Sequence, residues 1–168
     1  MASNLVRELR TKTDTAYANL SRQLQGMDAH LERADAPGEW NTRQVLCHLL
    51  FEPDWNPVNT LETFAHTNLP VMQITPGLTD TSGERAKMSL HQFLDALDRQ
   101  RKQVFAYLDG LSEADLERKS RIPLFKQIMG TDEISIPVYV GALFDYHWND
   151  HAGQLAKIRK AVGLPEAK

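Results

Sequence analysis

The chain lacks several features that define large classes of proteins. It has a single cysteine, Cys47, which excludes an intramolecular disulfide and is typical of a reducing compartment. It has no apolar run near the roughly 20 residues that a membrane helix needs. Residues 1–10 carry charges where a signal peptide needs an apolar stretch. We therefore expect a cytoplasmic protein that does not enter a membrane.

An excess of positive charge is also missing. The 19 Lys and Arg residues are outnumbered by 22 Asp and Glu residues, which gives a formal net charge of -3. This balance argues against a nucleic-acid-binding surface, because such a surface needs clustered Lys and Arg side chains. Hydrophobic residues make up 42% of the 168 residues, enough for a substantial core. We expect one domain over residues 1–168.

Signals for strands are scarce, whereas signals for helices recur along the chain. Apolar residues follow one another at steps of three and four, which is the spacing of a helix with one buried face. We predict long helices over residues 4–25, 41–52, 57–65, 89–108 and 137–163, and a short helical turn over 112–116. Long connections are expected over residues 66–83 and 118–134. This pattern indicates an all-α four-helix bundle with long connecting loops.

The second helix has a marked start and a marked interruption. Asn41 is a good N-cap residue, and Gln44 three positions later completes a capping box. Pro53 and Pro57 each remove a backbone donor and crowd the preceding turn. We therefore expect a break near Glu52, followed by a further helical segment.

A pair of histidines, His147 and His151, lies in the last predicted helix, on the stripe that also carries its apolar residues. That stripe consists of Ile136, Val140, Phe144, His147, His151, Leu155, Ile158 and Val162. Steps of three and four place these residues on one helix face. Imidazoles on a core-facing stripe need partners, because buried polar groups left unpaired are costly. A metal ion held between facing helices would be one partner, and buried carbonyls would be another.

A third histidine, His48, lies on the second helix on a face with apolar neighbours and Glu52. A bundle can bring that face toward the histidine pair. Three histidines with one or more waters form an open metal site of the catalytic type, and imidazole suits zinc, nickel, iron or copper. Glu52, one turn beyond His48, is a candidate general base or fourth ligand; the alternative is a solvated carboxylate or one that caps the helix break.

Two other polar side chains lie near the histidines in sequence. Cys47 neighbours His48 but points about 100° away from it around the helix, which predicts a small buried side chain rather than a nucleophile. Gln154 shares the helix face of the histidine pair. It either orients one histidine through a hydrogen bond or is a core amide bonded across the bundle.

Two segments of the chain resemble the DinB family. Residues 40–49, WNTRQVLCHL, are similar to its Trp-Ser/Thr-…-His-Leu segment, and residues 147–155, HWNDHAGQL, to its closing His-x3-His-x2-Gln segment. The short LSEADL element at residues 111–116 lies between them. The order and separation of the segments match the family, as does the predicted helix plan along nearly the whole chain.

The resemblance implies a bundle of the DinB/YfiT-like type with a divalent metal ion, commonly nickel or zinc, on His48, His147 and His151. Similar proteins include thiol-dependent enzymes, namely bacillithiol S-transferases and the mycothiol-dependent maleylpyruvate isomerase. We therefore expect a metal-dependent enzyme with thiol S-transferase-type chemistry. The alternatives are a metal-dependent hydrolase and a non-catalytic stress protein that binds a metal or small ligand.

Expectations about partners follow from the same reasoning. The substrate is expected to be a small molecule, including a low-molecular-weight thiol, and no nucleic acid is expected. Apolar residues such as Trp55 and Trp148, if exposed, favour a homodimer. Pro53 and Pro57 are not part of the family pattern, so we expect them to reshape the mouth of the pocket.

Overall fold

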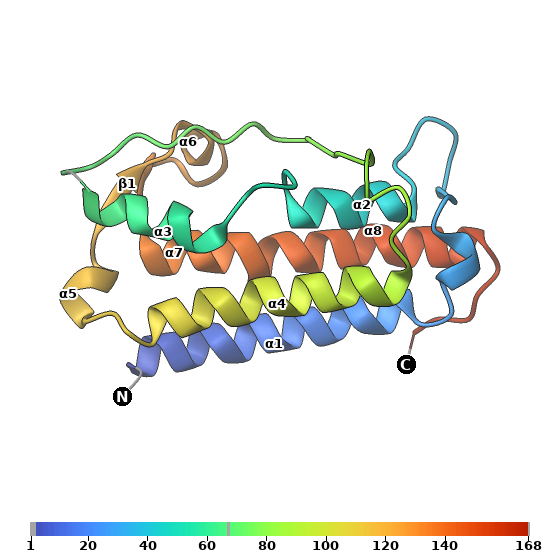
Figure 1. The fold of residues 1–168 in the computed structure, drawn as a ribbon, viewed down its shortest axis with the longest axis horizontal. Helices are drawn as coiled ribbons and strands as arrows, with labels where there is room; N and C mark the ends of the chain where they lie inside the picture. Colours follow the sequence, from blue (N-terminus) through green and yellow to red (C-terminus); the bar gives the residue numbers. More distant parts are fainter. Residues whose placement is uncertain (1–2, 67, 168) are drawn as a thin grey trace.

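Four helical rods lie side by side in the computed structural model, which describes residues 3–66 and 68–167 (Figure 1). In chain order they are α1 (Asn4–Leu24), α2 (Thr42–Leu50) with α3 (Pro57–His66), α4 (Leu90–Leu108), and α7 (Ile136–Gly141) with α8 (His147–Ala161). The first rod packs against α4 and against the α7–α8 rod, and α2 packs against both α4 and α8. This arrangement confirms the predicted all-α four-helix bundle.

The second rod begins and breaks where the sequence predicts. The Asn41 side chain accepts a hydrogen bond from the Gln44 backbone N–H at 2.9 Å, and the Gln44 side chain accepts one from the Asn41 N–H at 2.9 Å. The helix α2 ends at Leu50, and Pro57 opens α3. The capping box and the proline therefore fix the length of the element that carries His48.

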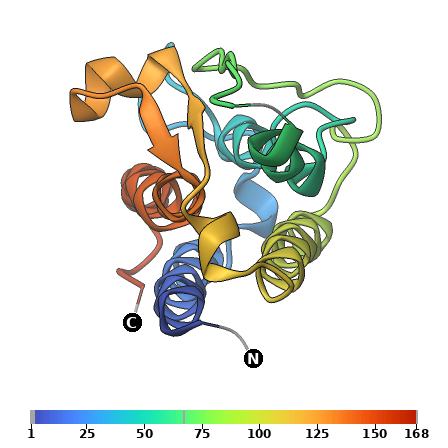
Figure 2. The same ribbon diagram turned by 90° about the vertical axis from the view of Figure 1, so that its left-hand side faces the viewer.

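The connection between α4 and α7 has more structure than the sequence predicts. After α5 (Glu113–Leu116), the strands β1 (Lys119–Arg121) and β2 (Glu133–Ser135) pair antiparallel, with α6 (Pro123–Met129) between them. Figure 2 shows these elements at one end of the bundle. Strands of three residues are too short for the alternation that identifies a strand in a sequence, so this segment reads as a plain connection.

The C-terminal rod buries the predicted stripe. Val140, Phe144, Leu155 and Ile158 are all fully buried, and His151 lies among them at 9% exposure. The helix is continuous except for one π-helical turn, η2 (Ala142–Tyr146), between α7 and α8. Among the described residues, no helix combines the length and the apolar character that crossing a membrane requires.

Trp148 belongs to the core and not to the surface. Its side chain is completely buried, its ring meets that of Phe144 edge-on at 4.8 Å, and Tyr17 of α1 lies 6.0 Å away. The suggestion that Trp148 is exposed is therefore wrong, because its side chain fills the contact between α1 and α8. Trp55 is half-buried. The homodimer stays a prediction. Of the two tryptophans that favoured it, only Trp55 keeps part of its surface exposed.

Candidate metal centre

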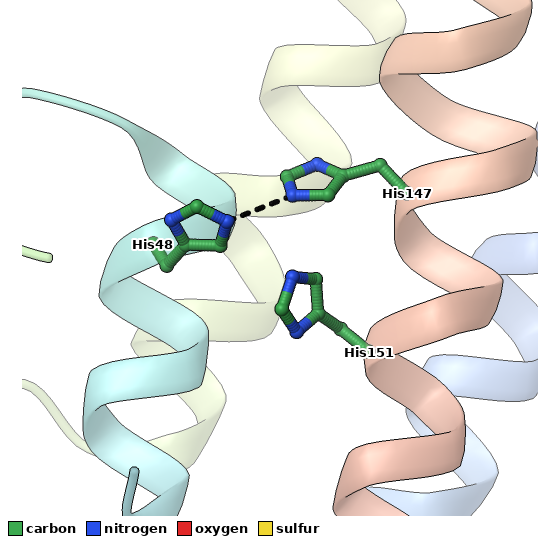
Figure 3. A group of neighbouring side chains, drawn as sticks. All are labelled: His48, His147 and His151. Atoms are coloured by element: carbon green, nitrogen blue, oxygen red, sulfur yellow. Dashed lines mark hydrogen bonds between the residues drawn. The ribbon is translucent and has the colours of Figure 1, made fainter. Parts of the chain in front are cut away.

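Three histidines from two helices meet inside the bundle (Figure 3). His48 comes from α2, and His147 and His151 come from successive turns of α8. One ring nitrogen of each lies within 4.8 Å of the others, and the Nε2 atoms of His48 and His147 are 2.9 Å apart. The structure thus brings together all three predicted ligands. In the described part of the chain they form the one cluster of at least three His, Cys, Asp or Glu side chains close enough to share an ion.

Two of the three rings donate a hydrogen bond from the nitrogen that faces away from the cluster. His48 Nδ1 donates to the backbone carbonyl of Leu78 at 2.7 Å, and His151 Nδ1 donates to Oε1 of Gln154 at 2.8 Å. A neutral imidazole carries one proton, so each of these bonds places that proton on Nδ1. The Nε2 atom of each ring is left with a free lone pair.

The π-helical turn changes the backbone hydrogen bonds next to His147. In a regular α-helix the backbone N–H of His147 would bond the carbonyl of Leu143, four residues earlier. In η2 it bonds the carbonyl of Ala142 instead. The Leu143 carbonyl is released from that bond and acts on the His147 ring, where it opposes the lowering of the ring's pKa. A single inserted residue is too short to be recognised from helical periodicity, so this turn could not be predicted from the sequence.

The three rings together fit a divalent metal ion. With the outer nitrogens of His48 and His151 protonated, their Nε2 lone pairs point into the cluster, where the Nε2 atom of His147 lies 2.9 Å from that of His48. Facing lone pairs repel unless a cation lies between them or one ring gives up its outer hydrogen bond. Three neutral imidazoles with an open fourth position are the donor set of a catalytic zinc-type site. Nitrogen donors alone do not choose between nickel and zinc.

The surroundings keep these imidazoles neutral. Burial lowers the pKa of His147 to about 3, and the neighbouring His151 and His48 act in the same direction. Burial also lowers the pKa of His151, partly opposed by its hydrogen bond to Gln154. The neutral imidazole is the form that binds a metal ion, so the site does not have to lose protons from these two rings at neutral pH.

Aromatic side chains flank the histidines on two sides. The Trp40 ring lies 4.9 Å from that of His48 and stacks on that of His151 at 6.2 Å. The Phe51 ring lies 5.9 Å from that of His147. These apolar faces limit the access of water to the cluster, which strengthens electrostatic interactions within it.

The other sequence candidates lie outside the cluster. Glu52 is exposed beyond the end of α2 and is not among the residues that approach the shared nitrogens. Cys47 is completely buried, and burial raises the pKa of its thiol to about 11. This agrees with the predicted role of Cys47 as a small core side chain rather than a nucleophile.

The loop over residues 68–89 contributes to the site without a motif of its own. Its Leu78 carbonyl holds the ring of His48, and the hydroxyl of Thr79 donates to the carbonyl of Gln44 in α2 at 2.8 Å. The loop is therefore attached to α2 on the side of His48. A backbone carbonyl is present at every position, so no residue type marks this contact in the sequence.

A buried arginine of the same loop closes the C-terminal end of α2. Arg85 is 9% exposed, and its guanidinium donates to the carbonyls of Cys47 and Leu50, both at 3.4 Å, and to that of Phe51. Arg43 of α2 in turn donates to the Arg85 carbonyl at 2.8 Å. The carbonyls of Cys47 and Leu50 lie in the last turn of α2, where carbonyls lack partners within the helix. A cation there also interacts favourably with the helix dipole.

Comparison with known proteins agrees with this architecture. The sequence model of the DinB superfamily matches residues 12–155. Among solved structures, the chain is similar to YfiT from Bacillus subtilis, with 18% sequence identity and a TM-score of 0.66 over 98% of this chain and 91% of that one. YfiT is described as a probable metal-dependent hydrolase with an unusual four-helix bundle topology. At this identity the likeness shows the fold. No protein of curated function matches the chain.

Proposed function

The chain belongs to the DinB superfamily, as the match over residues 12–155 shows, and on this basis we propose that it is a metal-dependent enzyme whose divalent ion is held by His48, His147 and His151. The observation that supports this proposal is the set of three converging ring nitrogens, with the outer nitrogens of His48 and His151 already hydrogen-bonded. We expect nickel or zinc, because imidazole nitrogens suit both.

For the reaction we propose thiol-dependent S-transferase-type chemistry. An ion at this site would supply Lewis acidity, which lowers the pKa of a thiol or a water at the open position. A thiol, with an ordinary pKa of about 8.5, needs less help from a protein base than water does. Among the described residues, no carboxylate joins the histidine cluster. In the transfer, the sulfur loses its proton to solvent and bonds to an electrophilic carbon, whose leaving group departs with the electron pair.

Hydrolysis of an ester or amide is the second candidate, and the likeness to YfiT favours it. It would use the same three histidines but also needs a group that takes a proton from water. Glu52 follows His48 by four residues, but it lies past the end of α2 and is exposed. Because it does not belong to the histidine cluster, hydrolysis is the weaker of the two proposals. A third possibility is a bundle that binds a metal ion without catalysis.

The ligand set is tested by metal analysis of protein purified without a histidine tag. We expect about one nickel or zinc ion per chain, and none in the variant with His48→Ala, His147→Ala and His151→Ala. His91→Ala is the matched control, because His91 is exposed on α4. Stoichiometric metal in the triple variant would refute the ligand set. Little metal, with no effect of EDTA on the fold, would support a bundle with unmetallated histidines.

The reaction is tested with the metal-loaded protein and two kinds of substrate. One assay supplies bacillithiol, mycothiol or glutathione with 1-chloro-2,4-dinitrobenzene and follows the thioether product, with chloride as the leaving group. The other supplies p-nitrophenyl acetate and follows p-nitrophenol. Thioether formation that requires His48 supports the transferase, whereas ester cleavage alone supports the hydrolase. If protein with a full complement of metal is inactive in both assays, the transferase and the hydrolase proposals are contradicted. A role in binding is then favoured.

A further inference from the structure

Phe51 has a backbone conformation that is unusual for a large side chain. Its φ of 58° and ψ of -156° combine a positive φ with an extended ψ, a region that is adopted almost only by glycine. The N–H of Phe51 donates to the carbonyl of His48, and the buried guanidinium of Arg85 donates to the carbonyl of Phe51. These two hydrogen bonds hold the backbone on both sides of Phe51. Glycine would adopt the same conformation with less strain. Strained residues of this kind gather at functional sites, so the Phe51 side chain is a candidate for a functional role.

The Phe51 ring connects the histidine cluster to a second aromatic side chain. Its centroid lies 5.9 Å from that of His147, 6.3 Å from that of His48 and 4.5 Å from that of Trp55. Aromatic rings at such separations are in contact. The rings of Phe51 and Trp55 therefore form one continuous aromatic surface next to the histidine cluster.

Both rings keep part of this surface available to a ligand. Phe51 and Trp55 are half-buried, and residues 52–54 between them are exposed. Pro53 and Pro57 restrict the backbone of the segment, so Trp55 is presented on a chain with little freedom. The two prolines, the unusual backbone of Phe51 and the two half-buried rings thus fall on the same few residues.

We propose that Phe51 and Trp55, together called the aromatic lip, bind the flat apolar part of a small molecule whose sulfur or oxygen occupies the open position of the histidine site. Covering the lip removes apolar surface from water, and ring stacking adds to this gain. The lip rests on the proposed function and adds a substrate class to it. Thiols or electrophiles that carry an aryl or benzyl group are preferred over short polar ones.

The lip is tested by ligand binding to the full-length protein loaded with cobalt(II), whose absorption spectrum changes when a thiolate coordinates. Benzyl mercaptan and 2-mercaptoethanol are titrated separately, because they present the same donor atom with and without a ring. We expect benzyl mercaptan to bind about tenfold more tightly, the effect of one stacked and partly buried ring.

Variants of the lip show which side chains cause the preference. Trp55→Ala and Phe51→Gly should each reduce the tenfold preference to roughly twofold or less, whereas Trp55→Phe should retain most of it. Glycine is chosen at Phe51 because it adopts the φ of 58° readily and so preserves the turn. Ile128→Ala, at an exposed apolar residue of α6, is the control and should leave the preference unchanged.

Cobalt stoichiometry and circular dichroism of each variant separate a lost ring from a lost fold. Protein that binds cobalt but binds both thiols equally overturns the aromatic lip and leaves the metal site standing. The same conclusion follows if the preference survives both Trp55→Ala and Phe51→Gly. Protein that never acquires a cobalt spectrum overturns the metal site, and the lip with it.

Discussion

At the scale of single residues, the acceptors behind the histidines define the site as much as the imidazoles do. The Leu78 carbonyl and the Gln154 side chain place the proton of each ring on its outer nitrogen. The inner nitrogens are then free to converge. The sequence leaves Gln154 open between a partner of a histidine and a core amide, and the structure supports the first of these, since its Oε1 lies 2.8 Å from His151 Nδ1.

Replacing Gln154 should therefore weaken metal binding without unfolding the bundle. We expect Gln154→Ala to lower the affinity for zinc about 10- to 100-fold, because His151 loses the bond that orients its ring. Gln154→Glu should restore most of the affinity. Competition with a chelating dye measures the affinity, and nitrogen-15 NMR reports the tautomer of His151.

The control for this substitution lies on the same helix. Lys157→Ala, at an exposed position of α8, should bind zinc like the parent protein. Unchanged affinity and an unchanged tautomer in Gln154→Ala would show that Gln154 is an ordinary core amide.

At the scale of elements, α2 is a helix of nine residues that depends on its surroundings. Isolated helices of this length are marginal in water. Its capping box stabilises one end, and Arg85 binds the carbonyls at the other. The position of His48 thus depends on the loop over residues 68–89 as well as on the bundle.

Removing the arginine should loosen this end of the helix. We expect Arg85→Met to reduce the free energy of unfolding by about 2 kcal/mol, because buried carbonyls lose a charged donor. Arg85→Lys should recover only part of the loss, since a single ammonium group cannot reach the carbonyls as the guanidinium does. Urea unfolding measures both. Lys87→Met, at an exposed residue of the same loop, should stay near the parent value, and an equal loss there would argue against the helix-end contact.

Local signals in the sequence predicted most elements, and contacts between distant residues account for what they missed. Apolar periodicity predicted the four rods, and Asn41 and Pro57 predicted the starts of α2 and α3. The strands β1 and β2 and the π-helical turn are too short to leave a periodic pattern. At the site, the apolar stripe indicated His147 and His151, the second helix supplied His48 as the third candidate, and the family resemblance implied the same three residues. No sequence motif marks the contacts that distant backbone carbonyls and Arg85 make with the site.

At the scale of the whole molecule, the histidine cluster links stability to pH. The pKa of His147 is lowered to about 3 in the folded protein, against about 6.5 for an ordinary histidine. The unfolded chain therefore binds more protons than the folded one between these values. In the metal-free protein, the contribution of His147 to the free energy of unfolding is fully present above about pH 6.5. It is lost as the pH falls toward 3.

This dependence can be measured by urea unfolding of the metal-free protein at several pH values. Below about pH 6.5, His147 alone should contribute a loss of about 1.4 kcal/mol per pH unit, and His151 acts in the same direction. His147→Gln should flatten the curve, whereas His91→Gln, at an exposed histidine, should not. A stability that does not change between pH 7 and pH 4.5 would contradict the lowered pKa.

The placement of the ligands has a consequence for the chain as a polymer. His48 and His147 are 99 residues apart in the sequence, yet their rings touch. An ion shared by them would join two distant points of the chain, as a disulfide does in secreted proteins, and links across long segments restrict the chain most. With Cys47 as its one cysteine, the chain cannot make such a bridge from sulfur. The ion would act as a removable staple that acid or a chelator opens and fresh metal closes again.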